Sequence, residues 1–94
     1  MDTNFETIEK ELIDFLQFPK TDVLDGDGYE KIRRNSDLIR ALTLGNLEHS
    51  KIKIFFEDNV SRKVVETTVW GVTDNRVILK QGIGIPINRI YKSA

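Results

Sequence analysis

The sequence predicts an α+β fold in which an N-terminal amphipathic helix and a short second helix precede a five-stranded antiparallel small β-barrel. Two observations indicate this class. Apolar residues recur at helical spacing up to about residue 45, and from Lys51 onward they alternate with polar residues. The 94 residues include no cysteine, so one packed core must stabilise the chain without disulfides or thiolate metal ligands. We expect one folding unit, with an acidic helical arm at 1–45 (containing a loop at 20–35) and the barrel at 46–94.

The first segment has the pattern of an amphipathic helix from Thr3 to Phe18. Its apolar residues recur at spacings of three and four along one stripe: Phe5, Ile8, Leu12, Phe15 and Leu16. Thr3 and Glu6 have the spacing of a capping box. Pro19 predicts the end of the helix, because proline cannot continue its hydrogen bonds.

A polar loop follows between Lys20 and Tyr29, where Gly26 and Gly28 favour irregular backbone. The second helix is predicted to run from Ser36, as N-cap, through Leu44. Its inward residues are Leu38, Ile39 and Leu42, and Gly45 is the expected left-handed terminator.

The pattern of the second half of the chain predicts short strands. Lys51–Phe56 alternates like a half-buried strand and ends in an acidic turn at residues 57–59. Residues 63–73 form a long run of β-favouring residues that Gly71 is expected to bend. The remaining strands are predicted at 76–81, 83–87 and 90–91. Closure of these strands into a small barrel would leave few exposed edges.

Charge divides the chain in two. Residues 1–50 carry six basic and eleven acidic side chains, whereas residues 51–94 carry eight basic and four acidic ones. The overall net charge of −1 argues against indiscriminate binding to nucleic acids or membranes. We expect no membrane association and a cytoplasmic location, because no window approaches the length of a membrane span.

Catalytic groups are scarce. His49 is the single histidine, and a lone histidine in a loop is usually structural or solvated. The run Asp25-Gly26-Asp27-Gly28 lacks the ligand spacing of a calcium-binding EF-hand loop. We therefore predict no catalytic residue, no metal site and no cofactor, and we expect the chain not to be an enzyme.

The candidate partner-binding residues are aromatic or basic: Tyr29, Lys53, Phe55, Trp70, Lys80 and Arg89. Strand alternation places Lys53 and Phe55 outward, where they could stack and pair with a single-stranded nucleic acid. Alternatively, Phe55 packs under the N-terminal helix and the lysines form a solvated face. Trp70 has two interpretations as well, as a core residue or as an exposed anchor for a partner.

The chain also resembles two groups of known proteins. The pattern of residues 51–90 resembles Sm-like and Src-homology-type small barrels. The segment Tyr29–Ile32, then Asp37-Leu38 with Ala41, and the closing Arg89-Ile90 resemble the Rho-binding antiterminator family, although Lys31, Arg33 and Asn59 depart from its usual Pro, Cys and Gly. That family combines an N-terminal helix with an Sm-like barrel and inhibits the transcription terminator Rho by binding it.

These observations lead to one expected function and two alternatives. We expect a non-catalytic regulatory module that binds a protein partner of the transcription or RNA machinery. The first alternative is a barrel that binds single-stranded RNA or DNA through its basic strands. The second is a structural module that associates with copies of itself, as Sm-like barrels do.

Overall fold

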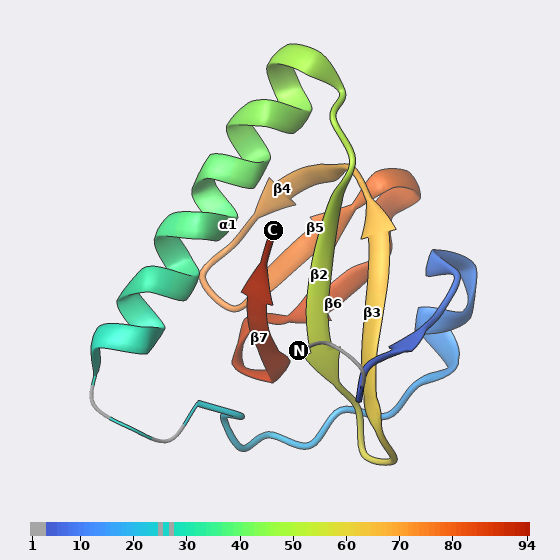
Figure 1. The fold of residues 1–94 in the computed structure, drawn as a ribbon. Helices are drawn as coiled ribbons and strands as arrows, with labels where there is room; N and C mark the ends of the chain where they lie inside the picture. Colours follow the sequence, from blue (N-terminus) through green and yellow to red (C-terminus); the bar gives the residue numbers. More distant parts are fainter. Residues whose placement is uncertain (1–3, 25, 27) are drawn as a thin grey trace.

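The computed structural model describes residues 4–24, 26 and 28–94. In this part of the chain a single α-helix packs beside two sheets (Figure 1). The first sheet has the strand order β1-β3-β2-β7 and the second has the order β4-β5-β6. Neither sheet closes on itself, so the predicted five-stranded barrel with two helices is wrong. The edges are protected in other ways: β1 covers part of β3, and the helix packs along β7 and β4.

The strands of the first sheet are β1 (Glu6–Thr7), β2 (Ile52–Glu57), β3 (Arg62–Thr67) and β7 (Ile90–Ser93). Those of the second are β4 (Val69–Val72), β5 (Arg76–Leu79) and β6 (Gly84–Pro86). The period-two pattern located the strands after residue 50, but not β1, because one face of each sheet is apolar and buried. Ile54, for example, lies opposite Val65 in the antiparallel β2-β3 pair, and both side chains are buried.

The long strand predicted at 63–73 is divided between the two sheets. β3 ends at Thr67 and β4 begins at Val69, with Thr68 between them. The Thr68 carbonyl accepts a hydrogen bond from the Lys80 amide (3.0 Å), and its hydroxyl donates to the His49 carbonyl (3.4 Å). The chain therefore leaves the first sheet at Thr68, three residues before the bend that Gly71 was expected to supply.

The helix α1 spans Gly28–Glu48, which makes it much longer than the predicted segment 36–44. Its buried residues follow spacings of four, three and four: Arg34, Leu38, Ala41 and Gly45. Ser36 is an exposed residue within the helix and not its N-cap. The terminating left-handed residue is His49 (φ 55°), whose amide donates to the Gly45 carbonyl at 3.1 Å.

Gly45 has a packing role instead. A Cβ atom at this position would lie 2.5 Å from the Val69 carbonyl oxygen and 3.1 Å from Thr68 Cγ2. The missing side chain therefore lets α1 approach the backbone of β4 closely.

The helix predicted from Thr3 to Phe18 is also wrong. Residues 6–7 form β1, which runs parallel to β3, and Lys10–Phe15 forms a short 3₁₀ helix, η1. The Ile8 amide donates to the Val64 carbonyl (3.0 Å), so the open edge of β3 supplies partners that a short isolated helix lacks. The capping-box residue Thr3 lies outside the described residues, as do Asp25 and Asp27 of the acidic loop.

A single core joins the helix, the sheets and η1. Its largest fully buried side chains are Phe56, Ile13, Leu38, Ile54, Leu79, Ile85 and Ile90. The predicted apolar stripe of the first segment is only partly inside: Ile8 and Leu16 pack against the core, whereas Leu12 and Phe15 are exposed. The fully buried residue of this segment is Ile13, which lay outside the predicted stripe. Among the described residues, no helix is long and apolar enough to cross a membrane.

Candidate functional site

The six predicted partner-binding residues do not form one surface. Phe55 and Arg89 are buried, with 3% and 6% of their surfaces exposed, so they serve internal contacts. The other four are exposed but lie on different elements: Tyr29 at the start of α1, Lys53 on β2, Trp70 on β4 and Lys80 after β5.

Phe55 lies beneath the N-terminal segment. The Phe5 ring packs edge-to-face on Phe55 with centroids 5.1 Å apart, and on Tyr91 at 5.7 Å. Lys92 Nζ lies 4.9 Å from the Phe55 centroid. Phe55 therefore faces outward from its sheet, as alternation predicted, but N-terminal residues cover it. Tyr91, which Phe5 also contacts, donates a hydrogen bond from its hydroxyl to Glu57. Burial is the main cause that raises the pKa of Tyr91, and this hydrogen bond raises it further.

Arg89 joins the segment after Pro19 to the first sheet through hydrogen bonds. Its Nε donates to the Glu57 carbonyl (3.1 Å), and Nη1 donates to the Thr21 carbonyl (2.8 Å) and hydroxyl (3.2 Å). A buried guanidinium needs such partners. The sequence predicts that Arg89 directly precedes the last strand, but it does not reveal that Arg89 bonds Glu57 and Thr21.

A second buried arginine was not among the predicted residues. Arg34 Nη1 and Nη2 donate to the two oxygens of Asp22 at 2.8 and 3.0 Å, and Nη1 also donates to the Ile90 carbonyl at 3.1 Å. Burial raises the pKa of Asp22, but the Arg34 and Leu24 hydrogen bonds and the nearby positive charges outweigh it and hold this pKa below its usual value. Arg34 falls in the apolar register of α1 with Leu38, which is the signal that could have identified it.

Asp58 and Lys63 form another internal pair, at the turn between β2 and β3. Asp58 Oδ1 accepts from Lys63 Nζ (3.1 Å) and from the amides of Val60 (3.1 Å) and Ser61 (2.9 Å). Burial opposes ionisation of Asp58, but these hydrogen bonds together lower its pKa. Both charged pairs therefore stabilise the fold and leave little chemistry for a ligand.

Trp70 is turned outward by an irregularity in the β4-β5 pair. The register shifts between Val69, opposite Leu79, and Gly71, opposite Ile78, and such bulges redirect a side chain. Val69 is consequently buried, while Trp70 is 53% exposed. The two interpretations of Trp70 are thereby resolved in favour of exposure.

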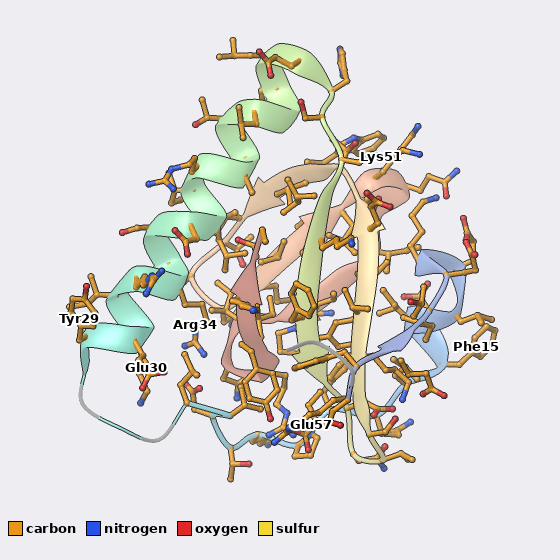
Figure 2. The ribbon with its side chains drawn as sticks, in the orientation of Figure 1. Phe15, Tyr29, Glu30, Arg34, Lys51 and Glu57 are labelled. Carbon is orange, nitrogen blue, oxygen red and sulfur yellow. The ribbon has the colours of Figure 1, made fainter. Side chains whose placement is uncertain are left out.

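Four of the eight exposed large hydrophobic side chains among the described residues lie on the outer side of α1. These four are Tyr29 (68%), Ile32 (68%), Ile39 (52%) and Leu47 (75%), which we call the outer stripe. At about 100° per residue, these four lie within about 80° of one another on the helix circumference. The centre of the outer stripe is about 170° from the centre of the buried stripe. Figure 2 shows Tyr29 pointing away from the sheets and Arg34 pointing toward them.

Two hollows border the outer stripe. One, of about 420 Å³, is lined by Ile32, Asn35, Ser36 and Ile39. The other, of about 230 Å³, separates α1 from the β4-β5 turn and is lined by Asn35, Leu38, Ile39, Val72, Thr73, Asp74 and Ile87. Ile39 contributes to both, so the apolar surface of the helix continues into a groove beside the second sheet.

Among the described residues, no group of three or more histidine or carboxylate side chains could hold a metal ion. His49 caps α1 with its backbone, as described above. Comparison of the chain with protein-family models, curated proteins and solved structures finds no match.

Proposed function

We propose that this chain is a non-catalytic regulatory module that binds a protein partner through the outer stripe of α1. The observation that supports this proposal is the pair of apolar stripes on opposite sides of one helix. A helix at the surface of a globular protein normally has one apolar stripe, facing the core, and polar residues opposite. The second stripe lies on the side of α1 opposite its buried residues, and its four members are more than half exposed.

The energy available at this surface is appropriate for recognition. Burial of an Ile, Leu or aromatic side chain contributes about 1.5–3 kcal/mol, and four such residues on the outer stripe are more than half exposed. Association must also offset lost rigid-body freedom, so the stripe suits a partner that contributes apolar side chains of its own.

The kind of partner follows from the resemblance to the Rho-binding antiterminator family. Its segments Tyr29–Ile32 and Asp37-Leu38, with Ala41, all lie on α1, and Tyr29 and Ile32 belong to the outer stripe. We propose a partner of the transcription or RNA machinery, with the terminator Rho as the first protein to test.

The test compares matched variants of the immobilised chain. Wild-type protein, Ile39→Asp and the control Phe15→Asp would be used to titrate purified Rho and to capture proteins from cell extract. Phe15 is a suitable control because it is 79% exposed and lies on the far side of the molecule from α1 (Figure 2). We expect wild type and Phe15→Asp to retain the same protein and Ile39→Asp to lose it. Equal retention by all three forms, or retention by none, would contradict the proposal.

A single-stranded nucleic acid is the second candidate ligand, and the outward position of Trp70 favours it. Lys80 comes directly after β5, and its amide donates to the carbonyl of Thr68, two residues before Trp70. A cation and an aromatic side chain therefore lie on neighbouring segments of the chain. Phe55, in contrast, lies under Phe5 and presents no stacking face. Titration of a labelled oligonucleotide would reveal salt-dependent binding that Trp70→Ala weakens, and no such binding would eliminate this candidate.

A further inference from the structure

The hollow on α1 has the geometry of a packing site for another helix. Its lining residues Ile32, Asn35, Ser36 and Ile39 occupy positions i, i+3, i+4 and i+7. Four residues with this spacing form the hole that receives one side chain, the knob, of a facing helix in knobs-into-holes packing. The small Ser36 side chain keeps the middle of the hole open, and the hollow has a volume of about 420 Å³.

We infer that the occupant is an amphipathic α-helix of a different protein, which inserts a large apolar side chain between Ile32 and Ile39. This inference rests on the proposed function and specifies the partner's binding element. A helix suits the surface because the outer stripe repeats at helical spacing from residue 29 to residue 47, a run of about 27 Å at 1.5 Å per residue.

Charge specifies the flanks of that helix. Arg33 and Arg40 are exposed and lie along one side of the outer stripe, whereas Asn35 and Asn46 lie along the other. Three acidic residues lie about 40–80° further around the helix, beyond the arginines: Glu30, Asp37 and Glu48. Asp37 is 3.7 Å from Arg40, and its side chain is only 24% exposed. One border of the stripe is therefore basic and the other is neutral. The complementary helix carries Asp or Glu on the side that faces Arg33 and Arg40.

The same charges disfavour a second copy of this chain as the occupant. When two identical helices pair antiparallel, each flank faces its own counterpart, so Arg33 and Arg40 would face Arg40 and Arg33 of the copy. When they pair parallel, the arginine flank faces the Asn35 and Asn46 flank and gains no opposite charge. Neither arrangement is complementary, and juxtaposed like charges oppose association.

The test uses two designed, fluorescently labelled 21-residue helical peptides with one leucine stripe in common. Glutamates flank the stripe in the first peptide, and lysines replace them in the second. Anisotropy titrations of the full chain should show at least about tenfold tighter binding of the glutamate peptide at low salt, since each surface ion pair contributes a modest free energy. The double variant Arg33→Glu/Arg40→Glu should reverse this preference.

The hole itself is tested by Ser36→Trp, which fills it from an exposed position, against Gln17→Trp as the control at another exposed site. Circular dichroism would first establish whether both variants are folded. We expect Ser36→Trp to weaken glutamate-peptide binding at least about tenfold and Gln17→Trp to leave it unchanged. Unaltered binding by Ser36→Trp, or equal affinity for both peptides, would overturn the inference.

Other occupants give distinguishable results, each of which also overturns it. A dimer that appears with rising concentration in light scattering and disappears in Ile39→Asp would identify a second copy. Displacement of the peptide by an oligonucleotide would identify a nucleic acid. If purified partner binds wild type but neither peptide does, the helix inference fails while the proposed function stands. If the peptides bind as expected and no protein is captured, the proposed function fails.

Discussion

Replacement of Gly45 by alanine tests how closely α1 packs on β4. The added Cβ would lie 2.5 Å from the Val69 carbonyl oxygen, whereas comfortable C···O contacts begin at about 3.3 Å. The helix and β4 must therefore separate by about 0.8 Å at this point, since a backbone carbonyl cannot rotate away as a flexible side chain does. Overpacking of this kind costs about 1–3 kcal/mol, and the better helix propensity of alanine offsets about 1 kcal/mol of it.

We expect Gly45→Ala to lower the free energy of unfolding by about 0–2 kcal/mol, the difference between these two effects, and the Tm by about 4–8 °C per kcal/mol for a domain of this size. The assay is thermal and urea denaturation followed by circular dichroism. Gly28→Ala is the matched control in the same helix, because a Cβ there meets no atom within 4 Å. A Gly45→Ala variant that is about 1 kcal/mol more stable than wild type, as helix propensity alone predicts, would refute the close approach of α1 to β4.

Three further predictions concern internal charges and Trp70. Arg34→Met should lower the free energy of unfolding by about 2–3 kcal/mol in urea titrations, because it leaves Asp22 and the Ile90 carbonyl without their donor; unchanged stability would contradict that role. The pKa values of Asp22 and Asp58 are lowered in the folded chain, so their contribution to the free energy of unfolding is complete above the unfolded-state pKa of about 4 and is lost as the pH falls below it. As the pH is lowered from 6 to 2, the urea denaturation midpoint should therefore fall less in Asp58→Asn than in wild type. Trp70 fluorescence should be quenched readily by acrylamide in the native state, and a protected, blue-shifted emission would show that the indole is buried.

The sequence located most of the β residues because their signal is local. Alternation in Lys51–Phe56 predicted β2, since buried Ile54 and Phe56 share one face of the first sheet. The division of the long strand at Thr68 could not be predicted. It depends on hydrogen bonds to Lys80 and His49, which are distant in the sequence.

The helices were misassigned for two different reasons. Apolar spacing from Phe5 to Leu16 predicted a helix, but the hydrogen-bonding edge of β3 captures residues 6–8, a tertiary effect that no local pattern contains. For α1, Gly28 predicts a loop, and the buried stripe begins with Arg34, a charged residue that an apolar pattern does not include. The outer stripe could not be recognised until the true extent of α1 was known.

The candidate site was predicted only in part for a related reason. Alternation along β2 places Phe55 on the outer face of the strand, as in the structure. It does not reveal that the Phe5 ring packs on that face and covers Phe55. Tyr29 is a candidate because it is aromatic and belongs to the segment that carries the family resemblance, and the structure places it on the outer stripe. The sequence predicts Ile32 in a loop, Ser36 as a helix cap and Ile39 in the core, whereas all three line the hole.

The most direct test of the proposed binding surface is backbone amide chemical-shift mapping of the ¹⁵N-labelled chain during titration with its captured partner or the glutamate-flanked peptide. Binding through the outer stripe predicts that the largest shift changes fall on Ile32, Asn35, Ser36 and Ile39, with little change around Trp70 and Lys80. Shift changes centred on β4 and β5, with α1 unaffected, would contradict it.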